Sequence, residues 1–76
     1  MIKIKSGTNL VNLLHAVKDT RGDVWFHTAQ GDRLNMKSLL NQYIFLAAAK
    51  EDESFCSSGE IVCDNEDDAA KLLEYV

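Results

Sequence analysis

The fold is decided by the stretch between residues 24 and 40, which reads VWFHTAQGDRLNMKSLL. Its first five residues are rich in aromatic and β-branched side chains, as is typical of a strand. Gln30-Gly31-Asp32 is a turn sequence, and the segment behind it places Leu34 and Met36 on one side of a second, short strand. Ser38 is a preferred N-cap, so a helix is expected directly after this hairpin.

Upstream of the hairpin, the sequence predicts one strand and one helix. Ile2 and Ile4 alternate with lysines, which indicates a strand with one buried face. Capping residues between Ser6 and Asn9 precede an apolar stripe with helical spacing, formed by Leu10, Leu13, Leu14 and Val17. Gly22 is expected to end this helix in a left-handed conformation.

Downstream of the hairpin, the sequence predicts two more helices and one strand. Leu39, Leu40, Tyr43 and Ile44 have helical spacing, and the run from 43 to 49 is apolar on every side. Polar residues end this helix, a loop follows at 57–59, and a strand is expected at 60–63. Asp64 and Asn65 are possible N-caps of a third helix, whose predicted apolar stripe consists of Ala69, Leu72, Leu73 and Val76.

The predicted order of elements is therefore βαββαβα in one domain, residues 1–76. Strands that alternate with helices around a central hairpin favour an α/β (α+β) open-faced sandwich. In such a sandwich a four-stranded, mainly antiparallel sheet is covered by three helices on one face. Trp25 and Phe26 are expected in the core and on the sheet surface.

Composition excludes several classes of protein. A hydrophobic content of 46% and a charged content of 26% are those of a globular domain, and no apolar run is long enough to span a membrane. The alternating start, MIKIK, lacks the apolar core of a secretory signal. With only Cys56 and Cys63, reduced thiols and a cytoplasmic location are expected. A net charge of −4 argues against nucleic acid and anionic membranes as partners.

The stretch Gly31–Leu40, the order of the elements and the size together resemble the HPr phosphocarrier family of the bacterial sugar phosphotransferase system. In that family a turn glycine, a short strand and a Lys-Ser-Leu/Ile helix start occur in the same order. Gly59-Glu60-Ile61-Val62, followed by an acidic helix start, is similar to the family's last strand and helix. The segment between the second helix and Gly59 is longer than the family norm.

The family's phosphocarrier motif, Gly-Leu-His-Ala-Arg-Pro-Ala, corresponds here to residues 7–13, GTNLVNL. Asn9 falls at the histidine, Val11 at the arginine and Asn12 at the proline. An amide cannot take up a phosphoryl group as imidazole does, and valine cannot hold phosphate oxygens as arginine does. His15 lies two helical turns beyond Asn9, so the role does not pass to it. The resemblance therefore implies a non-catalytic regulatory or interaction protein, not an enzyme.

The resemblance also implies partner contacts. Ser38 corresponds to the family's regulatory serine and is a candidate phosphosite, although as a preferred N-cap it can simply cap the second helix. If the family's use of its surface persists, the partner is a phosphotransferase-system component or a transcription regulator. The expected contacts are Asn9, Ser38, Leu39, Leu40 and Tyr43.

Other interpretations of the sequence stay open. The apolar run 43–49 indicates either a surface for a partner or self-association through the second helix, or burial under the following loop. A working phosphocarrier would have to use His15 or His27, and an unrelated small acidic adaptor or inhibitor is a third possibility. No cofactor is expected. The histidines and cysteines lack metal-site spacing, and the acidic groups 51–53 and 64–68 are expected to form a solvated loop and a helix start.

Overall fold

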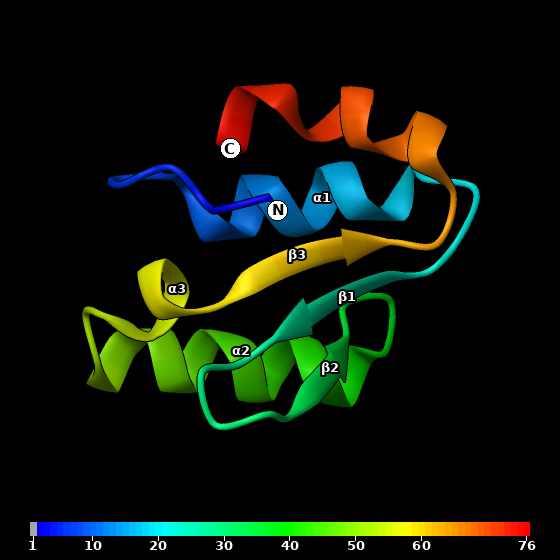
Figure 1. Ribbon diagram of the computed structural model, residues 1–76. Helices are drawn as coiled ribbons and strands as arrows, with labels where there is room; N and C mark the ends of the chain where they lie inside the picture. Colours follow the sequence, from blue (N-terminus) through cyan, green and yellow to red (C-terminus); the bar gives the residue numbers. More distant parts are fainter. Residues whose placement is uncertain (1) are drawn as a thin grey trace.

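The computed structural model describes residues 2–76 and has an α+β fold with a small antiparallel sheet (Figure 1). Within these residues the elements follow one another in the order α1, β1, β2, α2, α3, β3, η1. Their bounds are α1 Leu10–Lys18, β1 Val24–His27, β2 Arg33–Asn35, α2 Leu39–Glu51, α3 Phe55–Ser58, β3 Glu60–Cys63 and the 3-10 helix η1 Glu66–Tyr75.

The sheet has the strand order β2-β1-β3, and both pairs are antiparallel. Gly31 adopts a positive φ of 94° in the β1–β2 turn, which confirms the predicted hairpin. Phe26 is level with Leu34 on one side and with Ile61 on the other. Because side chains alternate along a strand, these three point to the same face, which is the face of the core.

The N-terminal segment is not the strand that its alternating pattern predicts. Ile2 makes a single bridge to Ile61, at the outer edge of β3, and the pairing goes no further within residues 2–76. The chain then turns toward η1, where the Lys5 N–H donates to the Tyr75 carbonyl at 2.7 Å. The sheet of the described residues therefore has three strands where four were expected. Ile4 is still buried in the core.

The first helix forms as its stripe predicts, since Leu13, Leu14 and Val17 are buried and Asn9 is the N-cap. The expected role of Gly22 is wrong, because its φ is not positive. Its missing side chain instead provides space, as a Cβ there would lie 3.1 Å from the Cβ of Asn65.

The second helix begins after Ser38, as predicted, and buries Phe45 completely. The sequence missed the short helix α3 that follows. Phe55 of α3 packs against Phe26 and Phe45, with ring centroids 5.2 and 5.9 Å apart. The longer segment after α2 thus covers part of the core with an aromatic side chain.

The last helix is a 3-10 helix, and this changes the predicted stripe. With three residues per turn, Ala69, Leu72 and Tyr75 lie in line, and these three are buried or half-buried. Leu73 belongs to a stripe of period 3.6 and is instead 68% exposed. Of the two possible N-caps, Asp64 and Asn65, the structure shows Asn65, whose side chain accepts from the Asp67 N–H.

The core lies against one face of the sheet. Val24 and Phe26 are fully buried, whereas Trp25 and His27, which alternate with them, stay partly exposed. In Figure 1, α1 and η1 run beside β3, and α2 runs beside β1 and β2. Within residues 2–76, no helix is both long and apolar enough to cross a membrane.

Candidate functional site

The start of α1 is the position at which the carrier histidine was expected to be replaced. The Asn9 side chain accepts a hydrogen bond from the Asn12 N–H at 3.1 Å, as an N-cap does. Val11 is exposed within the first turn, so the helix start presents an amide and an apolar side chain to solvent. Neither group can take up or hold a phosphoryl group.

The two histidines lie elsewhere. His15 is exposed in the last turn of α1, where the negative end of the helix dipole favours a cation and disfavours phosphate. His27 is the last residue of β1 and is half-buried. Neither lies at a helix N-terminus.

A depression of about 240 Å³ adjoins the start of α1. It lies between the loop at 4–8 and the segment around α3, with Lys5 and Glu53 among its lining residues. Cys56 also lines it, and burial raises the pKa of this thiol. A raised pKa keeps the thiol protonated, so Cys56 is a poor nucleophile at neutral pH. Within residues 2–76, no three His, Cys, Asp or Glu side chains gather as a metal site would need.

The second predicted contact region is the start of α2. The Ser38 hydroxyl accepts from the Asn41 N–H at 3.4 Å, and the Ser38 side chain is half-buried. The serine therefore serves as the N-cap of α2. The neighbouring Lys37 ammonium donates to the Thr20 carbonyl at 2.6 Å and so connects the start of α2 to the end of α1.

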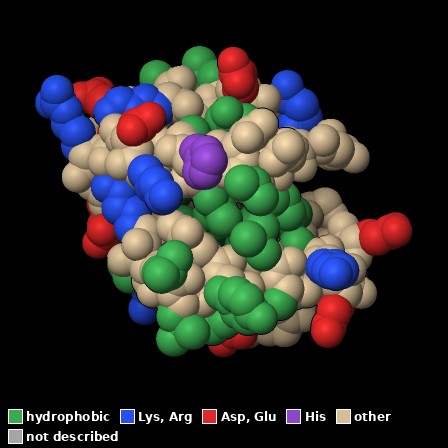
Figure 2. Space-filling view, turned by 180° about the vertical axis from the view of Figure 1, so that it is seen from behind, with side chains coloured by type: hydrophobic (Ala, Val, Ile, Leu, Met, Phe, Trp, Pro, Cys, Tyr) green, Lys and Arg blue, Asp and Glu red, His purple; other side chains and the backbone are tan. Residues whose placement is uncertain are grey.

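The most unusual surface is a set of large apolar side chains on α2, which we call the α2 face. Their exposed fractions range from 42% to 82%. They are Leu39, Leu40, Tyr43 and Ile44. Figure 2, which views the molecule from behind, shows hydrophobic side chains gathered at the height of α2. The expected contacts Leu39, Leu40 and Tyr43 are thus brought together in one place.

The α2 face exists because α2 is apolar nearly all round while only one side of it meets the core. Phe45 fills the core side, and the first turn of α2 carries no charged residue. A helix of this kind is normally buried on every side. Of the two alternatives for the run 43–49, burial under the following loop does not hold for Tyr43 and Ile44, which stay 74% and 42% exposed.

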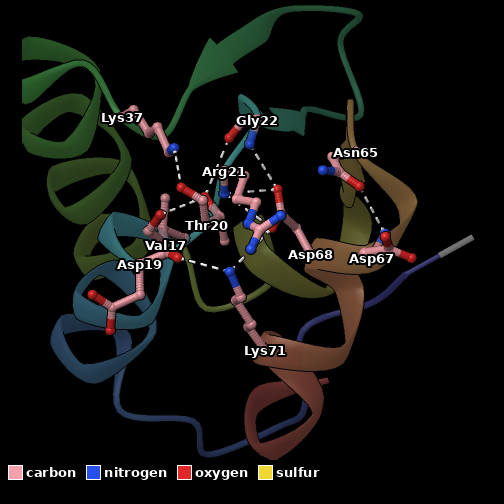
Figure 3. A network of polar contacts seen from close by, with 10 residues as sticks. All are labelled: Val17, Asp19, Thr20, Arg21, Gly22, Lys37, Asn65, Asp67, Asp68 and Lys71. Carbon is pink, nitrogen blue, oxygen red and sulfur yellow. Dashed lines mark hydrogen bonds and ion pairs between the residues drawn. The ribbon is translucent and has the colours of Figure 1, made fainter.

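A polar network holds the ends of α1 and η1 together (Figure 3). The Asp68 carboxylate is 1% exposed and accepts from the backbone N–H groups of Arg21 and Gly22 at 2.8–3.1 Å. Lys71 lies 3.5 Å from this carboxylate and also donates to the Asp19 carbonyl at 2.9 Å. The prediction that the acidic residues 64–68 form a helix start agrees with the structure, but the sequence did not indicate that Asp68 is buried. In the sequence, only the i, i+3 spacing between Asp68 and Lys71 indicated that Asp68 could be paired.

The Asp68 network makes stability depend on pH. The two backbone donors lower the pKa of Asp68 below its ordinary value, and Lys71 lowers it further. A carboxyl whose pKa is lowered on folding stabilises the protein above its unfolded-state pKa and loses this effect as the pH falls through the folded-state pKa. We expect Asp68→Asn to lower Tm by roughly 5–10 °C at pH 7, and by much less near pH 2, measured by circular dichroism.

The control for this experiment is Asp67→Asn, because Asp67 is the exposed neighbour on the same helix turn. Its Tm should follow the wild-type value at every pH. A Tm difference for Asp68→Asn that stays constant from pH 7 to pH 2 would contradict the assigned role.

Comparisons of the chain with protein-family models, with curated proteins and with solved structures gave no match.

Proposed function

We propose that this chain is a non-catalytic protein-interaction domain that binds a protein partner through the α2 face. The start of α1, where Asn9 is the N-cap, lies toward the other end of α2, beside Ala49 and Glu53, and is not part of this surface. The observation that carries the proposal is the exposure of four large apolar side chains side by side on α2. Contiguous apolar surface of this kind is costly in water and usually marks a contact site. Tyrosine is enriched at protein interfaces, and the buried centre of an interface is more apolar than the rest of the surface.

The proposal includes the expectation that the fold is related to that of the HPr family. The element order from α1 onward agrees with the expected one, apart from α3. The bridge from Ile2 to Ile61 lies at the outer edge of β3, where a fourth strand would stand. In this proposal Asn9 replaces the carrier histidine and acts as a helix cap. The partner is then a phosphotransferase-system component or a transcription regulator.

Phosphorylation of Ser38 is a second part of the proposal. A phosphate at the N-cap would lie at the positive end of α2, where backbone N–H groups and the dipole favour negative charge. It would also add charge at the border of the α2 face, next to Leu39. Such a modification would therefore alter partner binding without a change of fold.

The experiment is capture of the partner by the immobilised chain from an extract of the cells that produce it. Tyr43→Glu should abolish capture, because it places a charge in the centre of the α2 face. Asn12→Asp is the control, since Asn12 is exposed on α1 outside the α2 face. Unchanged capture by Tyr43→Glu would refute the proposed function.

A further inference from the structure

Helix α2 carries opposite charges at its two ends and apolar side chains between them. Lys37 precedes the helix, and no acidic residue lies in its first turn, so the positive end of the dipole is uncompensated. At the other end, one basic residue, Lys50, is followed by the three acidic residues 51–53, and all four are exposed, so the acidic groups outnumber the basic one. In Figure 2 the hydrophobic area has mainly Lys and Arg toward one side.

We propose that the α2 face is covered by a second copy of this chain, with the two α2 helices antiparallel about a two-fold axis near Ile44. This proposal rests on the proposed function, since it names a second copy as an occupant of the same surface. A two-fold contact buries the same patch on both copies, so the patch must complement itself. The charge distribution along α2 meets this condition.

The spacing of charges fits such an axis. Lys37 lies seven residues before Ile44, and Glu51 lies seven residues after it. At a rise of about 1.5 Å per residue, Glu51 is about 10 Å from the axis. Lys37 lies in the turn just before the N-cap Ser38, so in the antiparallel arrangement it stands at the end of α2 that faces Glu51 of the other copy. The acidic end of each helix then also lies beside the uncompensated positive end of its neighbour.

The spacing of side-chain sizes fits as well. Leu40 lies four residues before Ile44, and Ala47 and Ala48 lie three and four residues after it. In the antiparallel arrangement the large Leu40 side chain of one copy therefore meets small residues of the other. Large side chains opposite small ones allow two helices to approach closely.

A parallel arrangement of the two helices is disfavoured by the same residues. It would bring Lys37 level with Lys37 and Glu51 level with Glu51, and like charges at close range repel. The antiparallel dimer also has a functional consequence. Because it buries the α2 face, self-association and binding of another protein exclude one another, and the free monomer is the binding form.

The test is sedimentation equilibrium of the purified chain from micromolar to millimolar concentration. We expect a reversible transition from the chain mass of 8.5 kDa to twice that mass. Leu40→Glu should abolish the dimer, whereas Leu73→Glu should leave it unchanged. Leu73 is the matched control because both leucines are 68% exposed. A wild-type chain that stays monomeric at millimolar concentration would overturn the proposal.

Charge reversal tests the antiparallel geometry. Lys37→Glu alone and Glu51→Lys alone should each weaken the dimer roughly tenfold, because each places like charges together at two symmetric positions. Mixing the two variants should restore dimerisation as a heterodimer, since every facing pair is then of opposite sign. If the dissociation constant of the mixture is no lower than those of the separate variants, the antiparallel arrangement is contradicted.

Lys37 also donates to the Thr20 carbonyl, so circular dichroism must show that Lys37→Glu is folded. Glu51→Lys changes only an exposed side chain and remains informative if Lys37→Glu does not fold. If Glu51→Lys leaves dimerisation unchanged, the ends of α2 do not face one another and the proposal fails. These measurements use the purified chain alone, so a failed dimer is distinguishable from a failed partner capture.

Discussion

Replacing Phe45 with alanine is expected to lower the free energy of unfolding by about 3–5 kcal/mol. Phe45 is fully buried, and its ring contacts those of Phe26 and Phe55 with centroids 5.1 and 5.9 Å apart. Truncation leaves a cavity between α2, β1 and α3. A small domain has only about 0.05–0.15 kcal/mol of stability per residue, so this loss removes a large part of the total.

Urea unfolding followed by circular dichroism measures this effect. Leu73→Ala is the control, because Leu73 is an exposed side chain whose truncation should change the free energy by no more than about 0.5 kcal/mol. If Phe45→Ala is as stable as the control, the aromatic cluster does not form the centre of the core.

Replacing Gly59 with alanine is the second change with a large expected effect. A Cβ at Gly59 would lie 2.6 Å from the His27 carbonyl oxygen and would collide with the ring of Phe26. The ring cannot move aside, because Phe45 and Phe55 pack against it. Overpacking of this kind costs about 1–3 kcal/mol, and we expect a value near the upper end because the backbone is also in the way.

Ser58→Ala is the matched control for Gly59→Ala, since it changes the exposed neighbour on the preceding helical turn. Both variants can be compared by thermal unfolding. A Tm for Gly59→Ala within two or three degrees of the Ser58→Ala value would show that the close approach of β3 to β1 at Gly59 is not tight.

The parts of the fold that follow from local pattern could be predicted from the sequence. The hairpin needed a turn glycine between two β-rich segments, and Gly31 supplies it. The starts of α1, α2 and η1 were marked by capping residues at 6–9, 38 and 64–65. Among these, the side chains of Asn9, Ser38 and Asn65 accept from backbone N–H groups. These signals act over three or four residues, so they do not depend on the rest of the fold.

The parts that depend on distant contacts could not be predicted. The alternation of Ile2 and Ile4 is that of a strand, but the chain leaves β3 after one bridge and bonds to η1. Leu73 is exposed because η1 is a 3-10 helix and not an α-helix. The apolar residues of this segment do not by themselves distinguish a period of 3.6 residues from one of 3.0. Asp68 was hidden among exposed carboxylates because its donors come from a loop far away in sequence.

The candidate site could be predicted only in part from the sequence. The sequence indicated that the run 43–49 was too apolar to face one small core, and Leu39, Leu40 and Tyr43 were named as contacts. It left open whether the following loop covers the run 43–49. That question is decided by α3, which uses Phe55 to complete the core and leaves the α2 face uncovered.

The proposed replacement of the carrier histidine at the start of α1 concerns one side chain. Asn9 caps the helix with its amide oxygen, which accepts from Asn12. The cap explains why an amide suits this position, independently of any phosphate. The surface beside it then differs from a phosphate site, because the exposed Val11 is apolar.

The most direct test of the central claim, that the α2 face binds proteins, compares Leu40→Glu with Leu73→Glu in partner capture. Both changes replace a leucine of 68% exposure with glutamate, so they differ only in where the charge stands. We predict that Leu73→Glu captures as much partner as wild type, and Leu40→Glu less than roughly a tenth, as expected for a central anchor. Equal capture by the two variants would contradict the account.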